Sequence, residues 1–282
     1  MRKASEVASD LFSVDAKPQP GEGVQLDLFA STPAAVANAS TPRLDPTRCN
    51  DDTLITAIGE AGIGDVLDLV QEAGRRGLKA AVPTMARLCR LHAGYGLERE
   101  VPEQAAALRA MAAIGGAEAA QAVAGLLTRN VLQGPTLAIG VACAAQLHCR
   151  LPKPTAMALL RHQSPDVRAD ACACAGAGSE ITAVLLELLD DRHERVRLAA
   201  AMALAQRGRR EARPVLLPLL RRRPTPELIE AMAEIADAET LVLLGRIARE
   251  QPALAATAKT ALEAADDPQA EKILAALVRD GR

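Results

Sequence analysis

The chain has 282 residues, a net charge of -2 and a hydrophobic fraction of 49%, while aromatic residues make up only 1%. This length and apolar content allow one large or two modest domains, and the near-neutral charge excludes a polycation, so that any nucleic-acid surface must be local. Because small β-sandwiches rely on aromatic bulk to fill their cores, the composition favours thin layers of Ala- and Leu-rich helices instead.

The first twelve residues start with positive charge but lack the apolar stretch of a secretory signal. No stretch reaches the ~18 uncharged apolar residues that a membrane span needs. We therefore expect a cytoplasmic protein with no membrane partner. In that compartment its six cysteines are expected to be reduced thiols. They are Cys49, Cys89, Cys143, Cys149, Cys172 and Cys174.

Residues 1–50 have the composition of a linker. They contain five Pro residues, few long apolar runs and no sustained hydrophobic period, a composition typical of disordered segments. From residue 51 onward the pattern becomes helical. The sequence therefore predicts a disordered tail over residues 1–50 and a folded region over residues 51–282.

A compact apolar peptide interrupts this tail. It consists of Gln25, Leu26, Asp27, Leu28 and Phe29. The peptide resembles the motif by which bacterial polymerases, mismatch-repair proteins and other DNA-processing factors bind the β sliding clamp. The resemblance implies that Gln25 is the polar anchor and that Leu28 and Phe29 fill an apolar cleft, with Leu26 and Asp27 in support. An extended peptide in a disordered tail presents such groups without competition from its own core.

Two alternatives to clamp binding remain for this peptide. A five-residue motif can occur by chance, or the segment can fold back onto the rest of the chain. Three features favour the clamp: the match is complete, it lies in linker-like sequence, and it uses one of only two Phe residues in the chain.

Beyond the tail, apolar residues recur at the i, i+3, i+4 and i+7 spacing of helices, and almost nothing alternates with period two. In chain order, helices are predicted within 51–62, 64–77, 80–94, 101–116, 117–130, 135–149, 164–178, 180–191, 193–208, 211–223, 225–238 and 251–265.

The helical segments repeat. Residues 164–178 align with 193–208, so that Val167 falls 29 residues before Val196. A period of ~30 residues with two helices per unit indicates an α-solenoid. The repeat resembles the HEAT-repeat family in its short bacterial form, which is also found in phycobilin lyases. The resemblance implies an all-α solenoid of HEAT-like two-helix repeats over residues 51–282, and it says almost nothing about function.

Positive charge is concentrated in one part of this solenoid. Residues 192–223 contain ten Arg and two acidic residues. Because the turns between the two helices of each repeat line one edge of a solenoid, several of these Arg side chains are expected to form one basic stripe, which we call the Arg ridge. It consists of Arg161, Arg192, Arg195, Arg221, Arg222 and Arg223. Such a ridge suits the phosphates of duplex DNA or an acidic protein. Arg is also favoured at helix C-termini for structural reasons alone.

No motif for catalysis or metal binding is present. A P-loop, G-x-S-x-G, H-E-x-x-H and a spaced pair of C-x-x-C motifs are all missing. The Cys clusters at 143–149 and 172–174 cannot converge on one ion from a single helix, so these residues are expected to serve as small core residues. No catalytic residue, metal or cofactor is predicted.

We therefore expect a non-enzymatic adaptor that binds the sliding clamp and acts in DNA replication or repair. One alternative is a protein–protein scaffold unrelated to replication. A second is a DNA-repair enzyme of HEAT-like fold, although the chain has no Trp, the residue used in the base-recognition cleft of the HEAT-like glycosylases.

Overall fold

The computed structural model describes residues 44–62, 65–265 and 267–280. The predicted clamp-binding peptide lies outside these residues, and so do residues 1–43 of the segment 1–50 that is predicted to be disordered. The described part contains fifteen α-helices and three short 3-10 helices, and no strand beyond a single parallel bridge between Leu151 and Ala175. Within it, no helix has both the length and the hydropathy required to cross a bilayer.

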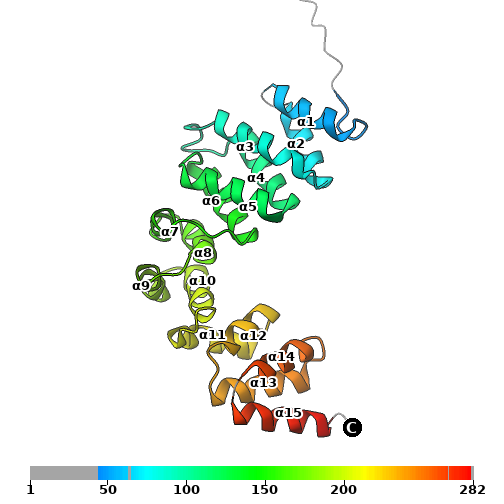
Figure 1. Cartoon of the computed structure of the whole chain (residues 1–282). Helices are drawn as coiled ribbons and strands as arrows, with labels where there is room; N and C mark the ends of the chain where they lie inside the picture. Colours follow the sequence, from blue (N-terminus) through cyan, green and yellow to red (C-terminus); the bar gives the residue numbers. More distant parts are fainter. Residues whose placement is uncertain (1–43, 63–64, 266, 281–282) are drawn as a thin grey trace, which may run out of the picture. The chain divides into compact units, whose positions relative to one another are not determined.

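The helices follow one another with short connections (Figure 1). Their bounds are α1 Asp51–Glu60, α2 Val66–Arg75, α3 Val82–Leu91, α4 Pro102–Ile114, α5 Gly116–Thr128, α6 Gly134–Gln146, α7 Lys153–Leu160, α8 Pro165–Cys174, α9 Ser179–Glu187, α10 Glu194–Ala205, α11 Arg213–Arg222, α12 Pro226–Ala233, α13 Ala238–Glu250, α14 Ala255–Ala264 and α15 Pro268–Asp280. The 3-10 helices are η1 Lys79–Ala81, η2 Leu188–Asp190 and η3 Arg210–Ala212.

The helices pack as pairs in two layers. Each even-numbered helix from α2 to α14 contacts the next even-numbered one, and each also packs against its odd-numbered neighbour in sequence. Contacts between odd-numbered helices, such as α3 with α5 and α7 with α9, form the second layer. This pattern confirms the predicted all-α solenoid of HEAT-like two-helix repeats.

Local signals in the sequence set the helix starts. The Asn50 side chain accepts a hydrogen bond from the Thr53 N–H at 2.8 Å and caps α1 at its predicted first residue, Asp51. Asp237 caps α13 in the same way through the N–H of Thr240. Pro occupies the first turn of several other helices, including α4, α8 and α12. Both devices satisfy or remove backbone donors that have no partner within the helix.

The core is built from small and aliphatic residues. Its largest fully buried side chains are Leu, Ile and Met, and neighbouring helices of the same layer approach closely. A Cβ atom added to Gly74 in α2 would lie 3.0 Å from the Cα of Ala110 in α4. Such close helix packing explains how the chain buries its core with almost no aromatic residues.

Candidate interaction surface

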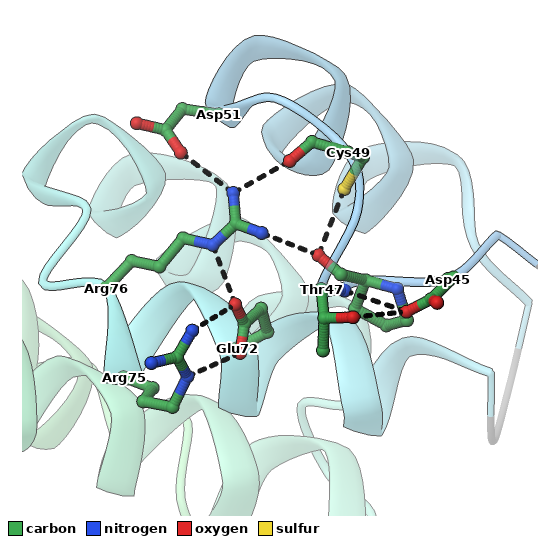
Figure 2. Close-up of polar contacts among 8 residues, drawn as sticks. Asp45, Thr47, Cys49, Asp51, Glu72, Arg75 and Arg76 are labelled. Carbon is green, nitrogen blue, oxygen red and sulfur yellow. Dashed lines mark hydrogen bonds and ion pairs between the residues drawn. The ribbon is translucent and has the colours of Figure 1, made fainter.

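The point where the tail joins the solenoid is held by one side chain (Figure 2). Arg76, at the end of α2, donates to the carbonyl oxygens of Pro46 and Cys49, each at 2.8 Å, and to Asp51 Oδ1 at 3.0 Å. These bonds attach residues 46–51 to α2. Any segment that precedes Pro46 therefore leaves the solenoid from a fixed position.

A buried carboxylate orients this arginine. Glu72 is 7% exposed and accepts hydrogen bonds from both Arg75 and Arg76, with N–O distances of 2.7 Å. The two guanidinium groups, Arg75 first, lower the pKa of Glu72 from its ordinary 4.5 to about 2. The cluster is missing from the sequence prediction. The sequence does show one local signal of the cluster, a Glu four residues before an Arg on one helix face. The bonds from Arg76 to residues 46–51 could not be predicted in this way, because they join positions 25 to 30 residues apart.

The repeat motif forms a polar ladder between repeats. Arg168 donates to the carbonyls of His162 and Gln163 and makes a two-pronged contact with Asp191, at 2.9 and 3.1 Å. One repeat later, Arg197 donates to the carbonyl of Asp191. Each arginine thus donates to the carbonyl of the residue six positions before it, as expected for equivalent positions in successive repeats.

The environment of Asp191 keeps it ionised. Burial by itself opposes the charged form, but the N–H of His193, at 2.9 Å, and the guanidinium of Arg168 outweigh it. The net result is a pKa for Asp191 below its ordinary value. The Arg168–Asp191 pair is therefore a structural element of the solenoid and is not available to a partner.

The structure brings part of the Arg ridge into contact with acidic side chains. Arg195, in the first turn of α10, pairs with Asp166 and Asp170 of α8. Arg195 and Asp166 occupy the same repeat position 29 residues apart, so stacking of equivalent positions juxtaposes opposite charges. Arg221 pairs with Glu239. Both arginines remain about half exposed, but their positive charge is partly cancelled.

Four members of the Arg ridge keep their charge without an acidic partner in the part of the chain described. They are Arg161, Arg192, Arg222 and Arg223, all of which are exposed. Each lies at or beside a turn that leads from an odd-numbered to an even-numbered helix. Fewer arginines of the Arg ridge therefore carry an uncompensated positive charge than the sequence suggests. DNA binding by the Arg ridge stays a prediction.

The cysteines lie where small core residues would. Cys89, Cys143, Cys149, Cys172 and Cys174 are buried free thiols, and Cys49 is half-buried. Burial raises the pKa of Cys143 to about 11 and those of Cys89, Cys172 and Cys174 to about 12. A protonated thiol is a poor nucleophile and metal ligand. Across the described residues, no three His, Cys, Asp or Glu side chains are grouped so that they could hold a metal ion.

Residues 153–235, from α7 to the end of α12, match the family model for HEAT repeats. The match includes residues 164–208, where the repeat is clearest in the sequence. No curated protein matches this chain.

Solved structures that resemble this chain include the following two. The complex of CpcE and CpcF of phycocyanin lyase from Nostoc sp. PCC7120 has a TM-score of 0.54 and 16% sequence identity, covering 84% of this chain and 95% of that chain. YibA of E. coli has a TM-score of 0.39 and 17% sequence identity, and the similarity covers 78% of this chain and 94% of the YibA chain. At this level of identity, the similarity to the phycocyanin lyase structure supports the HEAT-like fold alone.

Proposed function

We propose that this protein is a non-enzymatic adaptor that binds the bacterial β sliding clamp through Gln25, Leu26, Asp27, Leu28 and Phe29 and holds its HEAT-like solenoid near replicating or repaired DNA. The complete match of residues 25–29 to the clamp-binding pattern carries this proposal. The solenoid fold is consistent with a protein-binding role, since stacked repeats provide extended surfaces for partners.

The anchor at Arg76 defines the length of the connection between peptide and solenoid. The hydrogen bond of Arg76 to Pro46 makes residue 46 the first attached point. Residues 30–45 then form the connection. For a flexible linker of this length, the root-mean-square end-to-end distance is roughly 20–24 Å. That distance allows the solenoid to reach DNA beside a clamp to which the peptide is docked.

The test is a titration of a purified bacterial β clamp with the full chain and with a variant in which Gln25, Leu28 and Phe29 are changed to Ala. Burial of a Leu or Phe side chain contributes roughly 1.5–3 kcal/mol, so the triple variant should lose measurable binding. Its melting temperature should equal that of the parent chain. Equal clamp affinity for both proteins would overturn the proposal. A lower melting temperature of the variant would show that the peptide belongs to the fold.

We further propose that the same adaptor contacts duplex DNA through the four members of the Arg ridge that have no acidic partner in the described part of the chain. Changing Arg222 and Arg223 to Glu should weaken retention on duplex DNA at low salt and flatten its salt dependence, because fewer counterions are released. A change of Arg221 alone is the control. It should weaken retention less, because the charge of Arg221 is already partly compensated by Glu239. If the unaltered protein is not retained on DNA at low salt, the ridge binds an acidic protein or is structural.

The alternative is a HEAT-like protein–protein scaffold unrelated to replication, in which residues 25–29 match the motif by chance. The clamp titration separates the two, because a scaffold of that kind has no affinity for the clamp. A DNA-repair enzyme would be distinguished by turnover of damaged duplex DNA.

A further inference from the structure

A cavity of about 660 Å³ opens beside the connection between α3 and α4. Val66, Leu88, Leu91, Tyr95 and Val101 form much of its wall. The last residue of α3 and the connection that follows it, residues 91–101, hold three of the six exposed large hydrophobic side chains in the described part of the chain. These are Leu91, Tyr95 and Leu97, which are 69%, 67% and 72% exposed. Exposed apolar side chains gathered at a concave site are typical of a binding surface.

The connection is fixed in place, which makes the cavity preformed. The side-chain amide of Gln104 donates to the carbonyls of Cys89 and His92, at 2.8 and 3.2 Å. At its other end, the N–H of Val101 donates to the buried Thr136 hydroxyl at 3.0 Å. Both ends of the connection are therefore tied to neighbouring helices.

One wall of the cavity carries a buried carboxylate that has no partner. Glu103 is 6% exposed and lines the cavity. In contrast to Glu72 and Asp191, it makes no hydrogen bond or ion pair within the described residues. Its place in the first turn of α4 favours a negative charge there, but it provides no hydrogen-bond donor. The carboxylate of Glu103 is therefore free to pair with a cationic group that enters the cavity.

The other charged groups of the cavity are of both signs. Glu100 also lines the cavity and accepts a hydrogen bond from Arg109 at 3.1 Å. Arg99 and His92 face the cavity as well. Arg99 is exposed, so water screens its charge, whereas Glu103 lies in the wall of the cavity, within reach of a group that enters it.

We infer that this cavity binds a Lys or Arg side chain of a partner protein, flanked by aliphatic residues that cover Leu91, Tyr95 and Leu97. The cationic group pairs with Glu103 and the flanking residues pack on the apolar wall. This site lies on the solenoid and is separate from both the clamp peptide and the Arg ridge, so it goes beyond the proposed function.

Tyr95 provides a direct test, because it is the only Tyr in a chain that has no Trp. Its fluorescence therefore reports occupancy of this cavity alone. The probe is the capped peptide Leu-Lys-Leu, titrated into the full chain up to millimolar concentration. The controls are the same peptide with norleucine or Glu in place of Lys. The Lys peptide should change the emission saturably, and the two control peptides should bind on the order of ten-fold or more weakly.

Two isosteric variants separate binding from folding. Glu103→Gln should weaken binding of the Lys peptide on the order of ten-fold or more, while the variant stays folded, because the side chain keeps its size and has no partner within the described residues to lose. Glu98→Gln, an exposed residue of the same connection that does not line the cavity, should leave the affinity unchanged. No emission change with the Lys peptide, equal binding of the norleucine peptide, or equal affinity of Glu103→Gln would each overturn the inference.

Discussion

Arg168 and Arg221 form the same kind of ion pair in different surroundings. The Arg168 and Asp191 side chains are 10% and 9% exposed, whereas those of Arg221 and Glu239 are 54% and 50% exposed. Removal of one partner from a buried pair leaves the other charge buried and uncompensated. An exposed pair is screened by water and contributes little. Burial, rather than the number of ion pairs, therefore decides which arginines hold the solenoid together.

This difference can be measured with two matched substitutions. Arg168→Leu should lower the free energy of unfolding by about 3–5 kcal/mol, and Arg221→Leu should lower it by about 0–1 kcal/mol. Urea denaturation followed by circular dichroism would give both values. Similar losses for the two variants would show that the buried ladder has no special structural role.

Glu72 gives the stability a defined pH dependence. Its pKa in the folded chain, about 2, lies below its ordinary value of 4.5. The ionised side chain therefore stabilises the fold above pH 4.5, and this contribution is lost as the pH falls toward 2. In Glu72→Gln, the free energy of unfolding should fall less steeply over this range. Denaturation at a series of pH values would show it, with the exposed Glu60→Gln as control. Identical slopes for Glu72→Gln and the parent chain would contradict the assignment.

At the scale of helices, close packing through small residues replaces aromatic bulk. Gly74 of α2 faces Ala110 of α4 with no room for a further carbon, whereas a Cβ added to Gly125 of α5 would meet no atom within 4 Å. Substitution of Ala for each of these two glycines therefore distinguishes the effect of helix propensity on stability from the effect of helix packing.

Gly125→Ala should raise the free energy of unfolding by about 0.5–1 kcal/mol, since Ala favours the helix. Gly74→Ala should lower it by about 1 kcal/mol, because the new carbon meets the backbone of α4, which cannot move alone. Thermal melts of both variants would provide the comparison. A stabilised Gly74→Ala would show that α2 and α4 are less tightly packed than described.

Most of the helices and their repeat were readable from the sequence because they depend on local spacing, although α7, α15 and all but the first residue of α13 lie outside the predicted helical segments. Val167 and Val196 are both buried, at 1% and 0% exposure, as their alignment requires. The pairing of Arg195 with Asp166 could have been found from their equal repeat positions. The bonds of Arg76 and the burial of Glu103 could not, because they depend on how loops fold against helices distant in sequence. The clamp peptide remains a prediction from its motif.

For the molecule as a whole, the proposed function divides the tasks among different parts of the chain. Under this proposal, residues 25–29 bind the clamp, the bonds of Arg76 fix residues 46–51 on the solenoid, and the solenoid presents the Arg ridge and the cavity beside α4. The division requires that the clamp contact the peptide and leave the helices of the solenoid untouched.

Amide hydrogen exchange of the full chain, with and without purified β clamp, tests this division most directly. We expect fast exchange across residues 24–30 in the free chain, strong protection of the same residues when the clamp is added, and unchanged exchange in the helices from α1 to α15. Slow exchange across residues 24–30 without the clamp, or clamp-induced protection in the helices alone, would contradict this division.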